Sequence, residues 1–181
     1  MHDRLDMMKQ GRLTKVIVGL ILTISLLLAA ETFVAQPYRV GQGGMRNTLL
    51  PTQIILLDKL TSHLTANGRG DVVVFTPWGA TPGGFDFVKR VIGLPGETVD
   101  LQDGHVMING RQLSEPYVFE GQPTEPVEGA DHWVVPAGAL FVLGDHREIS
   151  ADSRIFGPIP ATSVVGRAWL RLWPVDAIAS L

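Results

Sequence analysis

Lys89 is the first residue whose setting in the sequence suggests chemistry. It lies in the apolar run Phe85–Leu94, whose side chains alternate between two faces if the run forms a strand. Lys89 then shares a face with Phe87 and Val91. A lysine amine among apolar side chains loses hydration, so its pKa falls and the neutral amine becomes available as a general base. The alternative is a lysine on an edge strand that extends its charged end to water.

A polar loop, Gly144–Arg154, is the second place where chemistry is possible, and it follows directly on an apolar run. Asp152 and Arg154 have opposite charges and can form an ion pair, and Ser150 can donate or accept a hydrogen bond. Such a loop at the end of a strand can hold a catalytic group in place. The alternative is a structural turn closed by a salt bridge, and the residues alone favour neither interpretation.

A β-rich body must position these residues. Short apolar runs alternate with turn signals, which predicts a mainly antiparallel all-β fold, arranged as a folded sheet, sandwich or barrel. The Asp103-Gly104 dipeptide predicts a tight hairpin. Residues Glu115–Asp131 are rich in Pro, Gly and Glu and are expected to form an exposed loop. Strands are expected at Gln53–Leu60, Asp71–Phe75, Phe85–Leu94, Thr98–Gln102, His105–Ile108, Arg111–Leu113, His132–Val135, Ala139–Leu143 and Val164–Leu172.

The N-terminus predicts a membrane anchor. Residues 1–15 carry four basic and two acidic side chains, a net charge of +2, and the fifteen residues from Val16 to Ala30 carry no charge. A stretch of about 20 apolar residues spans a bilayer, which residues 16–35 reach if Glu31 lies near the far interface. The basic side then faces the cytoplasm and residues 36–181 lie outside the plasma membrane. A cleaved secretory signal and a buried soluble helix are the alternatives.

The composition excludes several classes of protein. The chain has 181 residues, a net charge of -3 and no cysteine. The weak acidic charge argues against a nucleic-acid binder, and the lack of thiols excludes disulfides and cysteine nucleophiles. The five histidines have no metal-ligand spacing, so no metal site is expected.

Aromatic residues are expected mainly in the core, and this applies to Phe85, Trp133, Trp169 and Trp173. Trp78 lies in a loop rich in Gly and Pro, where burial is improbable. It is therefore the residue we expect to contact the bilayer surface.

Four stretches, in order along the chain, give the sequence a family resemblance. The third of these stretches begins at Lys89, and the fourth contains Ser150, Asp152 and Arg154. With the apolar N-terminal segment, they resemble the boxes of type I signal peptidases over about residues 16–170. The stretches are Gln36–Leu49, Arg69–Phe75, Lys89–Glu97 and Gly144–Gly157.

The resemblance implies a membrane-tethered serine endopeptidase with a serine–lysine dyad, which removes signal peptides from exported preproteins after small residues in an Ala-x-Ala-like site. Lys89 is then the general base and Ser150 orients its amine. Asp152 and Arg154 form a supporting ion pair. The implied partners are exported preproteins and membrane lipid, and no metal or organic cofactor takes part.

The nucleophile position departs from the family pattern. The family reads Pro-Ser-Gly-Ser-Met, with the second serine as nucleophile, whereas this chain reads Gly41-Gln-Gly-Gly-Met45. The nucleophile aligns with Gly44, and the serine that assists the oxyanion aligns with Gln42. Three explanations are open: a catalytically silent homologue, an active peptidase that uses Thr48 or Ser150, and a substitution in an otherwise working enzyme. A silent homologue would bind extended preprotein segments without cutting them.

Overall fold

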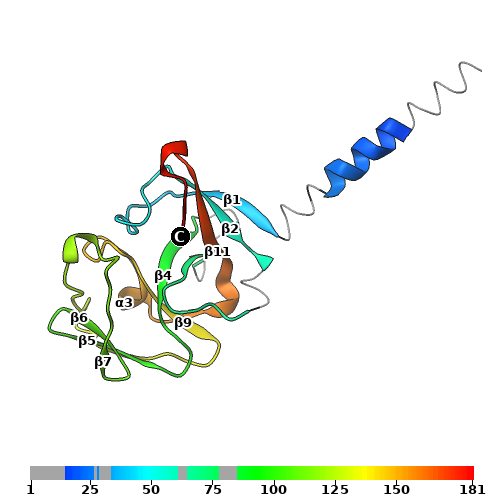
Figure 1. Cartoon of the computed structure of the whole chain (residues 1–181). Helices are drawn as coiled ribbons and strands as arrows, with labels where there is room; N and C mark the ends of the chain where they lie inside the picture. Colours follow the sequence, from blue (N-terminus) through cyan, green and yellow to red (C-terminus); the bar gives the residue numbers. More distant parts are fainter. Residues whose placement is uncertain (1–14, 27, 29–33, 61–64, 78–84) are drawn as a thin grey trace, which may run out of the picture.

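The fold consists of two antiparallel β-sheets, seen in a computed structural model that describes residues 15–26, 28, 34–60, 65–77 and 85–181 (Figure 1). The larger sheet has the strand order β1-β2-β11-β3-β4-β9-β10, with β12 added beside β11. Its strands are β1 (Ala35–Arg39), β2 (Ile54–Asp58), β3 (Val72–Phe75), β4 (Phe87–Gly93), β9 (Ala139–Leu143), β10 (Ile159–Pro160), β11 (Val164–Trp173) and β12 (Ala179–Ser180).

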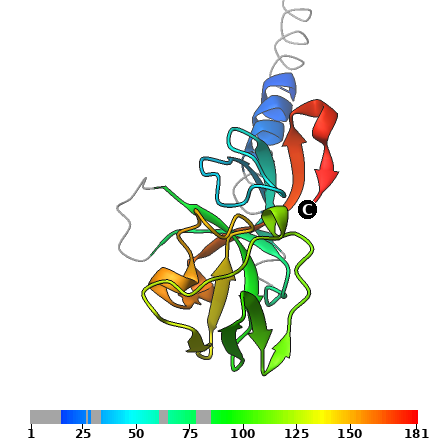
Figure 2. The same cartoon turned by 90° about the vertical axis from the view of Figure 1, so that its left-hand side faces the viewer.

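The smaller sheet has the order β7-β6-β5-β8 and lies beyond the end of β4, away from β1 and β12 (Figure 2). It contains β5 (Thr98–Gln102), β6 (His105–Ile108), β7 (Arg111–Gln112) and β8 (His132–Val134). The turn between β5 and β6 is Asp103-Gly104, and both residues have positive φ, 50° and 77°. Asp and Gly tolerate this conformation, which matches the right-handed twist of the flanking strands. The predicted hairpin is confirmed.

The helical elements with described bounds after the N-terminal segment are short. They are α3 (Ser153–Phe156) and three single turns, η1 (Phe119–Gly121), η2 (Ala161–Ser163) and η3 (Val175–Ala177). The Asp152 side chain caps α3 by accepting a hydrogen bond from the Arg154 backbone N–H. The mainly antiparallel β architecture expected from the sequence is therefore confirmed.

β4 connects the hydrophobic clusters of the core. Val88 belongs to a cluster with β2 and β3, Ile92 to one with the smaller sheet, and Val91 to one with β9 and β11. A strand buried on both faces holds its backbone and side chains in one register. Any functional group on β4 is thus held rigidly.

Three sequence predictions need correction. β1 was not expected as a strand, because Gln36 and Pro37 interrupt its apolar pattern, although β2 pairs with it along its whole length. The predicted loop 115–131 is only partly exposed, since Val118 and Thr124 are buried. Phe85, Trp169 and Trp173 are 87%, 54% and 53% exposed, so their predicted place in the core is wrong. Trp133 does pack against the core, on Phe141. Trp78 lies outside the described residues.

The N-terminal segment is helical at residues 15–26 and 28. Within the part of the chain that the structure describes, no helix has the length and apolar character needed to cross a bilayer. Residues 27 and 29–33 of the expected anchor, and most of the expected tail 1–15, lie outside the described residues. The anchor at 16–35 therefore stays a prediction.

Candidate functional site

Lys89 is buried in the middle of β4, with only 1% of its surface exposed. Its Nζ lies 5.4 Å from the centre of the Phe87 ring, as expected for two residues on one face of the strand. Burial lowers its pKa from 10.5 to about 8, although the nearby Asp152 and Asp145 carboxylates act in the opposite direction. A substantial share of the amine is therefore neutral near physiological pH, as a general base requires.

Gly44 lies directly against this amine. A Cβ atom built on Gly44 would lie 3.0 Å from Lys89 Nζ and 3.4 Å from Ser150 Oγ. The structure thus brings together three residues that are 45 and 61 positions apart in the sequence. Ser150 is 6% exposed, and its hydroxyl has no hydrogen-bond partner among the described residues. Any side chain at position 44 would project into the space between the lysine and the serine.

A helical turn holds the Gly44 segment in place. Thr48 and Leu49 donate backbone hydrogen bonds to the Met45 carbonyl oxygen, and the side chains of Met45 and Leu49 are buried in the core. The Gly44 carbonyl oxygen accepts a hydrogen bond from the His146 backbone N–H at 3.1 Å. This bond ties the segment directly to the polar loop that carries Ser150.

Gly144 allows this close approach. A Cβ on Gly144 would lie 2.1 Å from Ser150 Oγ and 2.4 Å from the Gly44 carbonyl oxygen, which no real side chain could accommodate. Only glycine fits here, for lack of space rather than for its backbone freedom. The sequence gives no sign of this constraint, because it depends on contacts between two distant loops.

Asp152 and Arg154 form the ion pair that the sequence predicted. Arg154 Nε donates to Asp152 Oδ1 at 2.9 Å and Arg154 Nη2 donates to Oδ2 at 3.0 Å, with both side chains buried. Asp152 Oδ2 also accepts from the Gly144 N–H, and Arg154 donates to the Arg147 carbonyl oxygen. The pair therefore links the two ends of the loop that carries Ser150 through buried hydrogen bonds.

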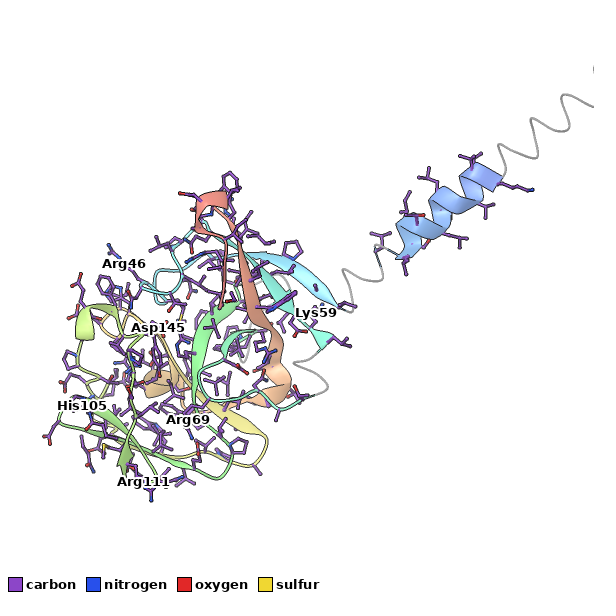
Figure 3. The ribbon with its side chains drawn as sticks, viewed as in Figure 1. Arg46, Lys59, Arg69, His105, Arg111 and Asp145 are labelled. Atoms are coloured by element: carbon purple, nitrogen blue, oxygen red, sulfur yellow. The ribbon has the colours of Figure 1, made fainter. Side chains whose placement is uncertain are left out.

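A second ion pair joins the two loops to β4, and the sequence did not identify it. Arg90 donates to both carboxylate oxygens of Asp145, at 2.8 and 2.7 Å, and also to the Thr48 hydroxyl. The Thr48 hydroxyl in turn donates to Asp145. Figure 3 places Asp145 inside the domain and Arg46 at its outer edge. The Thr48 oxygen is thus fully engaged as donor and acceptor, which leaves it poorly suited to act as a nucleophile.

A third buried ion pair anchors the 115–125 loop. Arg147 is 1% exposed and contacts Glu115 at 2.7 Å, and it also donates to the Thr124 hydroxyl and the Gly144 carbonyl oxygen. This pair explains why the loop predicted to be exposed packs against the site. The sequence does not predict this burial, because Arg147 lies among other polar residues of the loop.

Gln42 lies two residues before Gly44 in the chain. It lines a cavity of about 490 Å³, together with Tyr38, Gly41, Phe85 and Asp86. Its half-buried side chain carries an amide donor. Across the described residues, no group of three or more histidine or carboxylate side chains is arranged to hold a metal ion.

His146 lies in the polar loop and is buried. Its backbone N–H does bond to Gly44, but its ring Nδ1 is buried and has no partner among the described residues. The ring packs against Phe119 in a tilted arrangement, with ring centres 4.6 Å apart. The contact with Phe119 is thus the one that the structure shows for this ring.

Comparisons with known proteins identify the family of the chain. The family model described as signal peptidase, peptidase S26, matches residues 13–173. Signal peptidase I of Leptolyngbya laminosa is 38% identical over 165 residues, covering 88% of this chain and 79% of that protein. Signal peptidase I of Bacillus caldolyticus is 33% identical over 168 residues, which cover 86% of this chain and 89% of that protein. A crystal structure of a signal peptidase I from Enterococcus faecalis V583 is 37% identical, covers 57% of this chain and 97% of its own, and has a TM-score of 0.46.

The matched region includes every described strand except β12, and it includes residues 41–49 and 144–154. The chain therefore belongs to the signal peptidase family, peptidase S26.

Proposed function

We propose that this chain is a membrane-bound signal peptidase I family protein that receives exported preproteins but lacks the serine needed to cleave them by the family route. One observation supports this most strongly: a side chain at Gly44 would lie 3.0 Å from the Nζ of Lys89, whose amine is buried and partly neutral. The reaction centre is formed, and the hydroxyl is missing.

We assign the roles as follows. Lys89 is the general base, and Ser150 orients its amine from the other side of the Gly44 position. The Asp152–Arg154 pair supports the Ser150 loop through buried hydrogen bonds. Gln42 occupies the position from which the family's serine assists the oxyanion, and its amide is the available donor there.

The missing hydroxyl determines the chemistry. With a serine at position 44, Lys89 would take the hydroxyl proton while the oxygen attacks the scissile carbonyl carbon. The carbon–nitrogen bond would then break, the leaving amine would take the proton, and water would hydrolyse the ester that remains. Glycine supplies no oxygen for the first step. Loss of a nucleophile typically lowers the rate by several orders of magnitude, so we expect almost no cleavage.

The binding surface, in contrast, has the elements it needs. The 490 Å³ cavity beside Gln42 extends between the end of β1 and residues 85–86. An extended preprotein segment could bind there by strand addition, with shallow pockets for small side chains. Since glycine removes atoms from the cleft, binding is expected to survive. Cleavage by another hydroxyl has less support, because Thr48 is engaged with Arg90 and Asp145.

The proposed location is the plasma membrane. Residues 1–15 form the cytoplasmic tail, residues 16–35 the anchor and residues 36–181 the outer domain. The sequence pattern of a basic tail followed by uncharged apolar residues supports this topology. No metal or organic cofactor enters the proposed function.

Photo-crosslinking in membranes tests the proposed binding. A preprotein with a photoreactive residue just before its Ala-x-Ala-like site should give a saturable crosslink to the full-length chain. A matched preprotein with bulky residues in place of the two alanines should give much less, because the pockets admit only small side chains. If no saturable crosslink forms in membranes where an active signal peptidase I gives one, the binding proposal is wrong.

A further inference from the structure

The amine of Lys89 has a chemical property that its proposed role as a base does not use. A neutral lysine amine is a nucleophile as well as a base, and the position that faces it in this chain is Gly44, which carries no competing hydroxyl. Burial lowers the pKa of Lys89 to about 8, so about a tenth of the amine is neutral at pH 7, against roughly one part in three thousand at the ordinary value of 10.5. The amine is therefore able to attack an electrophile at neutral pH.

Glycines line the approach to this amine. A side chain at Gly44 would begin 3.0 Å from Lys89 Nζ, and the absence of one leaves that volume to a ligand. A Cβ on Gly43 would meet one described side chain, at 3.6 Å, and a Cβ on Gly41 would meet no described atom within 4 Å beyond its chain neighbours. Gly41 also lines the 490 Å³ cavity. A small acyl group that enters from this cavity therefore has room to bring its carbonyl carbon to the amine, where reacting atoms lie about 3 to 3.5 Å apart before attack.

The Ser150 hydroxyl is the second polar group at this place. It lies 3.4 Å from the position of a Gly44 Cβ, is buried, and has no hydrogen-bond partner among the described residues. A hydroxyl can accept a hydrogen bond from the amine and donate another to a carbonyl oxygen. A carbonyl group at Gly44 would thus have its carbon beside the Lys89 nitrogen and its oxygen beside a donor. Such a donor stabilises the negative charge that develops on the oxygen during attack.

The leaving group decides which acyl compounds can react. Attack by an amine on a peptide bond would only exchange one amide for another, and the departing nitrogen would need a proton from an acid. A thioester or an aryl ester instead expels a thiolate or a phenolate, which leaves readily because it is a weak base. The product is then an amide, which is more stable than the ester or thioester that it replaces. The expected donors are therefore thioesters and activated esters with small acyl groups.

We propose that Lys89 accepts the acyl group of a thioester or an activated ester at the Gly44 position and retains it as an amide. The bond between the acyl carbon and Lys89 Nζ forms, and the carbon–sulfur or carbon–oxygen bond breaks. The leaving thiolate or phenolate keeps the electron pair of that bond and takes the proton that the amine loses. Because the amide is stable in water, each chain reacts once. This activity goes beyond the proposed function, since it needs no bound preprotein.

Reaction of the full-length chain with p-nitrophenyl acetate tests this activity. At pH 7 we expect one acetyl group on Lys89, located by mass spectrometry. The half-exposed Lys59 is the internal comparison, and it should be acetylated at least roughly tenfold more slowly if the neutral amine rather than exposure controls the reaction. Alkaline hydroxylamine removes acetyl esters of serine but not amides, so the label should survive it. No acetyl group on Lys89, equal rates at Lys59, or a label that hydroxylamine removes from Ser150 would overturn the proposal.

Two glycine substitutions test the route through Gly44. Gly44→Ala places a methyl group 3.0 Å from Lys89 Nζ and should slow acetylation roughly tenfold or more, because displacing reacting groups by about 1 Å can cost about a hundredfold in rate. Gly68→Ala is the matched control, since a Cβ there meets only Asp71, at 3.7 Å, and it should leave the rate unchanged. Both rates are compared at pH 9, where Lys89 is mostly neutral, so that a shifted pKa does not cause the difference. Equal rates in the two variants would show that acyl groups do not reach Lys89 at Gly44.

Discussion

Lys89 is a residue whose burial weakens the fold. Desolvation lowers its pKa from 10.5 to about 8, and this difference corresponds to about 3 kcal/mol of destabilisation wherever the amine remains protonated. The attraction of the nearby Asp152 and Asp145 carboxylates offsets only part of the free-energy cost of removing the charged amine from water. A protein that had no use for a buried amine would be more stable with an apolar residue at this position.

Replacing Lys89 with Met should therefore stabilise the domain. At pH 7 we expect the free energy of unfolding to rise by up to about 3 kcal/mol, measured by urea denaturation. Because the unfolded chain binds more protons between pH 8 and pH 10.5, the unsubstituted protein should gain stability across that window, and the advantage of Lys89→Met should shrink. A destabilised variant at pH 7 would contradict the assigned cost of burying Lys89.

At the residue scale, sequence reasoning found Lys89, Ser150 and the Asp152–Arg154 pair because each is a polar group in a distinctive apolar or turn setting. It did not find the requirement for Gly144. The lack of space there arises only when the Gly44 carbonyl oxygen and the Ser150 side chain approach from other parts of the chain. Local patterns carry no information on such contacts.

At the element scale, three loops and the strand β4 make the site. Buried ion pairs join residues 144–154 to β4 and to residues 115–125. Hydrogen bonds of Thr48 and of the Gly44 carbonyl oxygen join residues 41–49 to the same centre. Strand positions followed from alternating apolar residues, as in the β5–β6 hairpin. The packing of the 115–125 loop did not, because it depends on the pairing of Glu115 with Arg147, 32 positions away.

Removing Arg147 should release this loop. Arg147→Met leaves Glu115 and Thr124 without their buried partner, so we expect the free energy of unfolding to fall by about 3 to 5 kcal/mol in urea denaturation. Arg46→Met is the matched control, since Arg46 is exposed and its guanidinium lies over the face of Phe119, 4.9 Å from the ring centre. Its loss should cost about 1 kcal/mol or less. Equal effects of the two substitutions would show that the buried pair does not anchor the loop.

At the scale of the whole molecule, apolar side chains gather where β11 meets the C-terminal segment. Trp169, Trp173, Val175 and Ile178 are each more than half exposed. Exposed tryptophans beside aliphatic residues are typical of surfaces that contact the headgroup region of a bilayer. The sequence predicted burial for both tryptophans, because nothing local indicates that β11 has few neighbours at its end.

Tryptophan fluorescence can test this surface in the full-length chain. In vesicles that contain brominated lipid, and in a Trp78→Phe background, we expect quenching that is largely lost on the paired substitution Trp169→Phe and Trp173→Phe. The control Trp133→Phe removes a tryptophan that packs on Phe141, and it should leave the quenching nearly unchanged. Quenching that survives the paired substitution would place these residues away from the bilayer.

The central claim is that the reaction centre at Gly44 is complete except for one hydroxyl. Cleavage of a preprotein by the membrane-inserted chain tests this claim directly. We predict no detectable cleavage by the unsubstituted protein and none by Gly44→Ala, which adds the Cβ without the oxygen. Gly44→Ser should cleave at the Ala-x-Ala-like site, with a rate that rises with pH up to about 8, as Lys89 loses its proton, and then levels off. Cleavage by the unsubstituted protein that disappears in Lys89→Ala, or no cleavage by a folded Gly44→Ser variant, would contradict this prediction.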